Sequence, residues 1–315
     1  MRPFFSIIIP LYNKENHIKS TLEHVLAQTF KDFEIIVIND GSTDKSKTVV
    51  ERIKDDRLKL LNIKNQGVSH ARNYGIEKAS SNLIVFLDAD DLWRNNHLTN
   101  LKALYTAFPN CGLYATAYQK KNNKITISSV YNHISSTKNW MGIVDNYFES
   151  SVVNSIAWTS AVMIPKSIFE TIGNFNENIT LGAGEDTDLW IRIALKYPVA
   201  FSTKVTAIYI LHSDNRISKS NTSLRQFLDL DVYENEANCN ASLKKYLDLN
   251  RFSIAIQYKL AGNPNKAKSL IDKIDATNLN TKQRSLLKLN STALKCLLNI
   301  KNRLQNSGIL LSSYK

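Results

Sequence analysis

The sequence predicts an α/β protein, in which a doubly wound, mostly parallel sheet carries helices on both faces and a helical extension follows at the C-terminal end. Three observations predict it. Short apolar runs alternate with helical patterns through the first part of the chain. Several of these runs end in polar clusters, at the place where open α/β sheets bind ligands. After about residue 220 strand patterns give way to helical ones.

Four short apolar runs in the first part of the chain are predicted to be strands. Two of them are rich in β-branched residues, as strands buried on both faces are. Helical spacing of apolar residues follows the first three runs, so the strands should be parallel and joined by right-handed crossovers. The runs are Phe4–Ile9, Phe33–Ile38, Leu58–Ile63 and Leu83–Leu87, and the helices are expected at Ile18–Ala27, after Asp44, and at Val68–Lys78.

The fourth run ends in three carboxylates, Asp88, Asp90 and Asp91. Carboxylates this close together repel one another, and neither a helix nor a strand gains from them. At the end of a buried strand, such hard oxygen ligands suit Mg²⁺ or Mn²⁺ holding a phosphate-bearing substrate. An acidic loop without a ligand is the competing interpretation of these residues taken alone.

Other predicted loops at the same edge of the sheet carry groups that suit a nucleotide. Asp40 ends the second run and can accept a hydrogen bond from a base or a ribose. Tyr12 offers a ring for stacking, and Arg72 a cation for a diphosphate. The chain has no Gly-x-Gly-x-x-Gly turn after the first strand and no Gly-Lys-Ser/Thr loop, which disfavours nicotinamide and P-loop chemistry.

Five short motifs in this order closely resemble those of the inverting glycosyltransferases of family 2, which have the GT-A fold. The resemblance covers roughly residues 4–215; each motif is weak by itself, and the ordered set is specific. The motifs are Pro10-Leu-Tyr-Asn13, Asn39–Asp44, Asn65-Gln-Gly67 with Ala71-Arg-Asn73, Asp88–Asp91, and the acidic stretch Gly184–Arg192.

The resemblance implies a role for each of these motifs. Asp40 would bind uracil, Tyr12 would stack on it, and Arg72 would approach the diphosphate. Asp88 would touch the ribose, Asp90 would bind a divalent metal ion, Mn²⁺ or Mg²⁺, and Asp186 would be the catalytic base. The remaining residues expected at the nucleotide-sugar site are Pro10, Asn13, Gly67 and Ala89, and those expected on the acceptor or donor-sugar side are Asp91, Trp158, Thr159 and Glu185.

The second half of the predicted domain leaves alternatives open. A strand at Ala157–Ile164 would place Trp158 under a sugar ring, although this side chain can equally belong to the core. Asp186 opens a helix predicted to reach Lys196, where acidic residues are often only partners of the helix dipole. His212 follows a β-rich run and is a second metal-ligand candidate, against the more common structural role of a lone histidine.

The C-terminal part is predicted to be helical and basic. From Thr222 to Lys315 there are fifteen Lys or Arg residues and seven Asp or Glu residues, so 8 of the 12 net positive charges lie there. Helices are expected at Leu224–Lys245, on both sides of a turn at Gly262–Pro264, and at Thr281–Leu304. The last of these is amphipathic and basic, which fits either a core helix with solvated lysines or an anchor on an anionic membrane surface.

These patterns divide the chain into a catalytic domain and an extension. Residues 1–220 form the GT-A domain, with a nucleotide-sugar half at about 1–110 and an acceptor half at about 111–220, and residues 221–315 form the basic helical extension. Three scattered cysteines, no signal-peptide pattern and no apolar run of membrane-spanning length predict a cytoplasmic protein, held at most peripherally on the inner face of the plasma membrane.

The predicted function is inverting transfer of a sugar from a nucleoside diphosphate sugar, UDP by resemblance, to a hydroxyl of a glycan or lipid-linked acceptor in bacterial surface polysaccharide synthesis. The Gln-x-x-Arg-Trp motif of processive relatives is absent, so one or a few sugars should be added. Two alternatives are a nucleotide-sugar-binding protein without transfer activity and a basic protein that binds nucleic acid or a membrane surface. Nucleic acid is disfavoured because the basic tail is Leu-rich and aromatic-poor.

Overall fold

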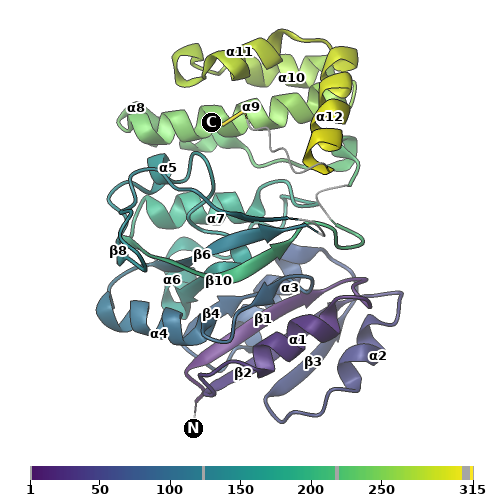
Figure 1. The fold of residues 1–315 in the computed structure, drawn as a ribbon, viewed down its shortest axis with the longest axis vertical. Helices are drawn as coiled ribbons and strands as arrows, with labels where there is room; N and C mark the ends of the chain where they lie inside the picture. The colour runs from purple at the N-terminus through teal and green to yellow at the C-terminus, as the bar shows by residue number, and fades with distance from the viewer. Residues whose placement is uncertain (1, 123–124, 217–219, 307–312, 315) are drawn as a thin grey trace.

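The structure is a computed structural model that describes residues 2–122, 125–216, 220–306 and 313–314. A layered sheet domain occupies one end and a stack of helices the other (Figure 1). The strands of the sheet are β1 (Phe5–Leu11), β2 (Phe33–Asp40), β3 (Leu58–Ile63), β4 (Leu83–Phe86), β5 (Leu92–Trp93), β6 (Leu113–Lys121), β7 (Thr126–Ser128), β8 (Met141–Ile143), β9 (Val162–Pro165) and β10 (Val199–Ile210).

The sheet joins a parallel half to a mixed half. Its strand order is β3-β2-β1-β4-β9-β6-β10-β5, with β7 paired to β6 and β8 to β10. The four strands predicted from the first half of the chain are parallel to one another, as expected. Beyond β4 the sheet changes, because β9 runs antiparallel to both β4 and β6, and β10 is parallel to β6 but antiparallel to β5 and β8. The parallel half therefore holds the nucleotide-side motifs, and the mixed half begins beside Asp88.

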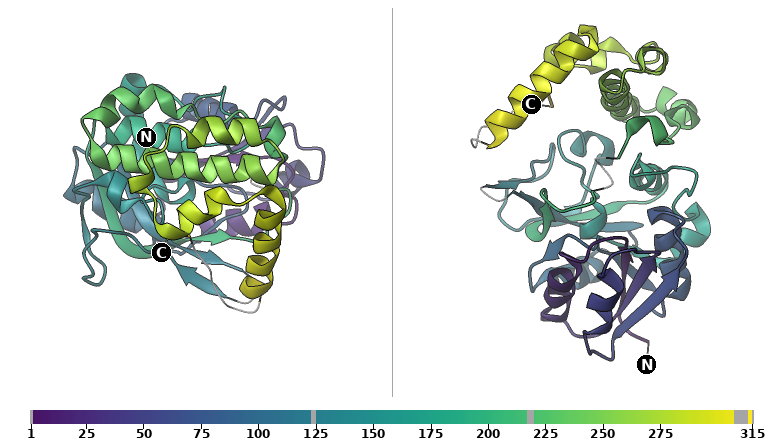
Figure 2. Two further views of the ribbon diagram at one scale, coloured as in Figure 1. Left: turned by 90° about the horizontal axis from the view of Figure 1, so that it is seen from above. Right: turned by 90° about the vertical axis from the view of Figure 1, so that its right-hand side faces the viewer.

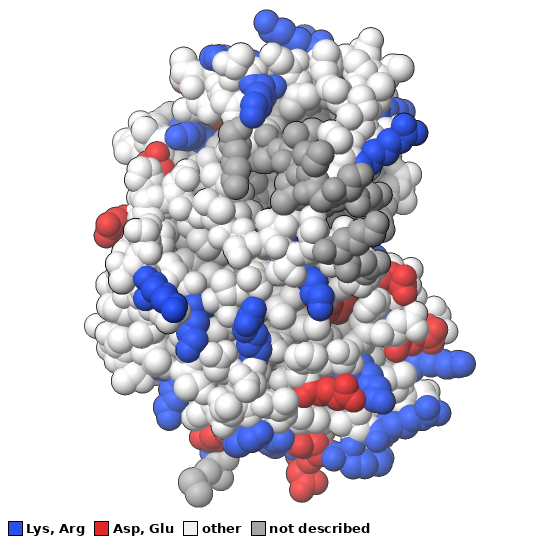
Figure 3. All heavy atoms as spheres, in the orientation of Figure 1, with Lys and Arg blue, Asp and Glu red and all other residues white. Residues whose placement is uncertain are grey.

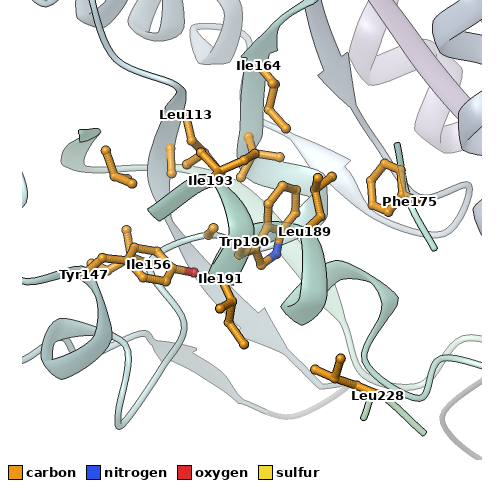
Figure 4. Packing of buried hydrophobic residues seen from close by; sticks show 14 of the residues in the cluster. Leu113, Tyr147, Ile156, Ile164, Phe175, Leu189, Trp190, Ile191, Ile193 and Leu228 are labelled. Carbon is orange, nitrogen blue, oxygen red and sulfur yellow. The ribbon is translucent and has the colours of Figure 1, made fainter. Parts of the chain in front are cut away.

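Helices cover both faces of the sheet, which confirms the predicted fold class. One core lies under α1, α2 and α4, and the other under α3, α6 and α7. Figure 4 shows the second core around α7, where Leu189 and Trp190 turn toward Phe175. The helices of the whole chain are α1 (Ile18–Leu26), α2 (Ser46–Glu51), α3 (Val68–Lys78), α4 (His97–Ala107), α5 (Tyr147–Ser150), α6 (Lys166–Ile172), α7 (Glu185–Ala194), α8 (Glu234–Asn238), α9 (Ala241–Leu260), α10 (Pro264–Ile271), α11 (Thr281–Lys288) and α12 (Ser291–Asn306).

The predicted strand at Ala157–Ile164 is wrong in its first half. Residues Thr159–Ala161 form a short 3-10 helix, and only Val162–Pro165 form the strand β9. The reason is a set of contacts from the aspartate loop, since the Trp93 indole N–H donates to the Ser160 carbonyl at 2.6 Å and the Ser160 hydroxyl donates to Asp91 at 2.6 Å. These long-range bonds curl the chain just before β9.

The helices of the extension begin and end at other residues than predicted. The stretch expected as one helix at Leu224–Lys245 contains only short helical turns before α9, which starts after its cap Asn240 and continues through Arg251. The helix expected at Thr281–Leu304 is broken, because Leu289 is extended and the Asn290 side chain accepts from the Ala293 N–H as a new cap. The turn between α9 and α10 at Gly262–Pro264 is confirmed.

The extension packs against the sheet domain through α9, which lies along α5 on the same side as α7 (Figures 1 and 2). Apolar side chains on both sides of residue 220, among them Trp190, Leu228 and Leu247, belong to one continuous core. The fully buried Arg251 of α9 pairs with Asp248, Asp231 and Glu234. The helix α12 contacts α9 and lies at the edge of the helical extension (Figure 2). The division of the chain into two parts at residue 220 stays a prediction.

Candidate active site

The loop after β2 is built around Asp40. Its carboxylate accepts the backbone N–H groups of Gln66 at 2.8 Å and Gly67 at 2.9 Å, which fixes the turn before α3. Gly67 has φ of +93°, a conformation that other residues rarely adopt. Burial raises the pKa of Asp40, and the two backbone donors oppose that rise. Asp40 therefore holds the loop in shape, and its binding of a base stays a prediction.

The loop after β1 is locked to the loop after β2 by Asn13. The Asn13 side-chain oxygen accepts from the Thr43 N–H at 2.8 Å, and the Asn13 N–H donates to the Ser42 hydroxyl at 3.1 Å. Asn13 has a positive φ of 49°, which asparagine tolerates better than most residues. Next to it, Tyr12 leaves 45% of its surface exposed, while Pro10 at the end of β1 is half-buried. The ring of Tyr12 is thus available to a ligand.

Arg72 of α3 connects the nucleotide side to the acceptor side. Its guanidinium donates to Asp88 at 2.9 Å and to Glu185 at 3.2 Å, and it lies over the Phe175 ring. Burial works against the charge, yet Asp88 and Glu185 raise the pKa of Arg72 overall. Glu185 is itself buried, and burial together with Asp186 raises the pKa of Glu185 despite Arg72. The Nε of Arg72 and Oε2 of Glu185 have no partner in the described residues.

Asp90 is bound by groups that the sequence motifs did not indicate. Its Oδ2 accepts from Lys14 Nζ at 2.7 Å and from the Ser213 hydroxyl at 2.6 Å. Lys14 also donates to the carbonyl of Asp214 at 2.6 Å, so the ammonium group closes the loop after β10 onto the aspartate loop. Lys14 directly follows the Pro10–Asn13 motif, and this position is the feature of the sequence by which Lys14 could have been assigned to the site.

The carboxylates at the end of β4 fit a divalent ion shared with a phosphate-bearing substrate. Asp88 Oδ2 and Asp90 Oδ1 accept no hydrogen bond from the described residues, so each aspartate keeps one oxygen for a cation. Mg²⁺ typically takes one or two protein carboxylates and fills its other positions with phosphate and water. No group of three or more His, Cys, Asp or Glu suited to a metal occurs within the described parts of the chain. A metal site here would thus depend on the substrate.

His212 is placed differently from the other metal-ligand candidate. It is exposed in the turn after β10, and it is the next residue, Ser213, that contacts Asp90. Among the residues described, His212 forms no ion pair with Asp90. Its part in metal binding stays a prediction.

Two residues of the Asp88–Asp91 motif point inward. Asp91 is 1% exposed, and its oxygens accept from the Ser160 hydroxyl and from the Ile210 N–H. Burial, followed by the charges of Asp90 and Asp88, raises the pKa of Asp91 well above its ordinary value. Ala89 is buried, and its carbonyl accepts from Thr21. Both residues shape the loop in this structure, so their predicted contacts with the nucleotide sugar stay predictions.

Asp186 lies at the start of α7, half-buried beside Glu185. The loop before it contains Gly184, whose φ of +108° brings the backbone close to Leu228. Asp186 Oδ1 accepts from the Thr187 N–H at 2.7 Å, whereas Oδ2 has only a long contact of 3.4 Å from the buried Thr159 hydroxyl. Trp158, half-buried against Tyr118 and Tyr209, precedes Thr159. Asp186 Oδ2 therefore keeps hydrogen-bonding capacity for a further group, and its role as the base stays a prediction.

The structure brings most of the predicted residues to one edge of the sheet. The chain of contacts runs from Asp88 through Arg72 to Glu185, whose neighbour is Asp186. Such an arrangement has a cation between two carboxylate groups and a weakly held carboxylate beyond them, which suits displacement of a charged leaving group by an activated hydroxyl. Sequence motifs did not point to Ser160, although this residue binds both Asp91 and the Asp88 N–H.

Comparisons of the sequence agree with this arrangement. The sequence model of the family described as glycosyl transferase family 2 matches residues 6–173, more than half of the chain. The chain is 32% identical over 216 residues to an uncharacterized glycosyltransferase of Rickettsia bellii, covering 67% of this chain and 29% of that protein. A second uncharacterized glycosyltransferase, from Rickettsia felis, is 35% identical over 196 residues, covering 61% of this chain and 30% of that protein. The region matched by this chain thus covers less than a third of the length of each of these two relatives.

The fold is also similar to solved structures of S. aureus TarS. TarS 1–349 in complex with UDP-GlcNAc matches with a TM-score of 0.59 at 17% sequence identity, covering 91% of this chain and 78% of that one. The structure of TarS 1–349 without a named ligand gives a TM-score of 0.57 at 18% identity, covering 86% of this chain and 90% of that one. At such identities the likeness concerns the fold, and it confirms the predicted GT-A architecture.

Proposed function

This chain belongs to glycosyl transferase family 2, and on that premise we propose that it transfers a sugar from a UDP-sugar to an acceptor hydroxyl with inversion at the anomeric carbon. The observation that carries the proposal is the buried Arg72, which joins the aspartate loop at Asp88 to Glu185 beside Asp186. A donor diphosphate and an acceptor hydroxyl would meet across this link. TarS, which has a similar fold, was solved with UDP-GlcNAc bound, and this supports a uridine donor.

Donor binding is assigned to the edge formed by β1, β2 and β4. Tyr12 would stack on the base, Asp40 would accept from it, and Asp88 would bind the ribose. Arg72 would neutralise part of the diphosphate charge, because its guanidinium already faces Asp88 in a buried setting where charges act strongly. Pro10, Asn13 and Gly67 would hold the two loops in place around the nucleotide.

The transfer step is assigned to Asp186. Its carboxylate takes the proton of the acceptor hydroxyl while that oxygen attacks the anomeric carbon from the face opposite the nucleotide. The bond between the anomeric carbon and the diphosphate oxygen breaks, UDP leaves with the electron pair, and the new glycosidic bond is inverted. Trp158 and Thr159 would position the sugar near Asp186.

A divalent ion, Mn²⁺ or Mg²⁺, is part of the proposal, with Asp90 as its principal ligand. When bound, such an ion stabilises negative charge on a leaving diphosphate. Asp88 would assist through its free oxygen, and Lys14 would have to release Asp90 or share it. The acceptor is proposed to be a glycan or a lipid-linked sugar of a bacterial surface polysaccharide.

The test of the proposal is UDP binding measured by titration calorimetry with and without Mn²⁺. Wild-type protein should bind UDP more tightly with Mn²⁺, and D90N should lose that gain while keeping its melting temperature. A matched control is Asp145→Asn, a substitution of an exposed aspartate away from the site. Unchanged metal dependence in D90N would remove Asp90 from the metal role, and a wild-type protein that binds no nucleotide would overturn the whole proposal.

Transfer itself needs a separate measurement, because a protein that only binds a nucleotide sugar would pass the calorimetric test. Slow hydrolysis of a panel of nucleotide sugars, followed by release of the nucleoside diphosphate, should single out one donor. On the face shown in Figure 3, the basic side chains of the described residues are scattered over both regions, which does not favour nucleic acid as the ligand of this face.

Association with an anionic membrane surface is also proposed, through α12. Leu297 and Ile300 are 44% and 45% exposed at helical spacing, and the helix contains Lys295, Lys301 and Arg303 but no acid. No helix within the described ranges is both long and apolar enough to span a bilayer. Full-length protein should float with phosphatidylglycerol vesicles and leave them at high salt, because salt screens the basic side chains.

The membrane proposal has its own control. Leu297→Ser with Ile300→Ser should reduce flotation several-fold, whereas Leu224→Ser, at an exposed leucine outside α12, should not. Equal binding to anionic and neutral vesicles would contradict it.

A further inference from the structure

We propose that helix α9 of the extension forms one wall of an acceptor subsite, a pocket at Asp186 that binds a single sugar ring. The inference rests on the proposed function, since it gives the acceptor a place beside the proposed base. It assigns the extension a part in choosing the acceptor, which neither the family match nor the sequence motifs include. The family match ends at residue 173, before α7 and α9.

The pocket lies between the start of α7, the loop after α5, and α9. Its volume is about 230 Å³, and the side chains that matter for binding are Trp158, Asp186, Trp190, Tyr246, Asn250 and Ser253. At ~30 Å³ for each water molecule, this is space for roughly eight waters. One monosaccharide fits such a volume, and a longer saccharide would have to leave through the mouth.

The lining combines aromatic surface with polar atoms, as sites for sugars do. Trp158 reaches the pocket from the sheet domain and Tyr246 from α9. Asn250 donates its side-chain N–H to the Tyr246 carbonyl at 2.8 Å and also bonds the Tyr246 side chain, so it fixes this wall and offers its remaining hydrogen-bonding capacity to a ligand hydroxyl.

A packing void between α7 and α9 is the alternative interpretation of this pocket. Voids that stay empty are lined by apolar groups, because a buried polar atom without a partner is costly. This pocket is lined by the polar side chains of Asp186, Asn250 and Ser253, so an occupant that bonds to them must be polar. Because the carboxylate of the proposed base lies at the pocket, we infer that the occupant is the acceptor, the molecule whose hydroxyl the base activates.

The extension also holds the residues around Asp186 in position. The Leu228 N–H donates to the Ala183 carbonyl at 3.1 Å, and the Tyr233 hydroxyl donates to Asp188 at 2.6 Å, so both ends of the Asp186 turn are tied to it. Burial chiefly, and among nearby charges that of Asp186, raises the pKa of Tyr246, which places α9 within electrostatic reach of the base. The wall of the pocket and the base are thus parts of one assembly.

The test uses the full chain and simple probes. Saturation-transfer NMR with methyl β-glucoside, methyl β-galactoside and methyl β-N-acetylglucosaminide should show contact with wild-type protein for at least one of the three. Asn250→Leu should weaken that binding roughly five-fold, the loss of about one hydrogen bond. Ser253→Leu, which fills the pocket, should do the same. Asn238→Leu, the same change at an exposed residue of the extension, is the matched control.

The outcomes separate this inference from the proposed function. UDP binding should be equal in all variants and wild type, because the nucleotide side lies across Arg72. Sugar binding that Asn250→Leu and Ser253→Leu leave unchanged, with melting temperatures intact, would overturn the subsite even if UDP binds. Absence of saturation transfer to all three glycosides would also overturn the subsite. A wild-type protein that does not bind UDP would contradict the proposed function instead.

Discussion

The nucleotide side and the acceptor side of the site are built in different ways. On the nucleotide side, loops that directly follow strands hold one another, as Asn13 does with Thr43 and Asp40 with Gly67. These two bonds join loops of neighbouring parallel strands within the first 91 residues, although Asp90 of the same edge also accepts from Ser213 after β10. On the acceptor side, Asp186 is surrounded by segments from the mixed half of the sheet and from the extension, up to Ser253.

The difference suggests a division of labour between a common donor site and a particular acceptor site. A donor site made from strand-end loops depends mainly on the parallel half of the sheet, with Ser160 and Ser213 as added supports of the aspartate loop. An acceptor site made from distant segments changes when any of them changes. Substitutions at four positions test whether the two sides are as separate as this comparison holds, and they are taken in order of decreasing expected effect.

Asp186→Asn should separate chemistry from donor binding. Asparagine keeps the shape of aspartate but cannot take the proton, so transfer should fall roughly 100-fold or more while UDP affinity stays unchanged. Asp188→Asn is the informative comparison. Asp188 bonds Arg192 and Tyr233, so its variant should lose thermal stability and retain most of the transfer rate per folded molecule. Weaker UDP binding in Asp186→Asn would show that the two sides are not independent.

Arg72 bonds groups on both sides, so its loss should damage both. Arg72→Gln leaves Asp88 and the buried Glu185 without their cation, which should cost about 3–5 kcal/mol in the free energy of unfolding. Urea denaturation measures this. Arg57→Gln is the control, because Arg57 pairs with Asp55 near the surface and should cost at most about 1 kcal/mol. Equal losses of unfolding free energy in the two variants would mean that the buried ion pairs of Arg72 contribute no more to stability than the surface pair of Arg57.

Tyr233→Phe should affect the acceptor side alone. It removes the hydroxyl that donates to the buried Asp188, a bond to a charged group worth about 2 kcal/mol. The unfolding free energy should fall by that amount, and the acceptor KM should rise more than kcat falls, because the turn that carries Asp186 loosens. Steady-state kinetics with each substrate varied in turn decides this. A rise in the donor KM instead would assign Tyr233 to the nucleotide side.

Asp91→Asn should stabilise the protein in a pH-dependent way. Because the pKa of Asp91 is raised in the folded state, the wild-type protein binds this proton more tightly than the unfolded chain and loses stability as pH rises from about 4 through the raised value. The asparagine variant would avoid that loss. Thermal or urea unfolding should show the variant more stable than the wild type at neutral pH and level with it near pH ~3. A difference in stability between variant and wild type that shrinks as pH rises would contradict a raised pKa of the buried Asp91.

Particular residues show which parts of the fold and the site could be predicted from the sequence. Strand-end motifs are local, and the four predicted strands of the parallel half appear where expected, so the positions of Asp40, Asp88 and Asp90 at or just after strand ends followed from the sequence, while their roles stay predictions. Elements beyond residue 92 were harder. The helix α4 and the strand β6 had not been predicted at all. The breaks at Asn240 and Asn290 were missed, because capping by one side chain interrupts a helical pattern without changing its periodicity.

The sequence by itself determined the order of strands and helices in the parallel half and the residues at its edge, because apolar periodicity and turn chemistry act over a few residues. Tertiary structure alone decided what those residues contact. Lys14 bonds Asp90 from 76 positions away, Arg72 meets Glu185 across 113, and α9 reaches the pocket at Asp186 from a segment that the motifs leave out. Contacts of this range depend on how packed elements meet in space, and no spacing along the chain encodes that distance.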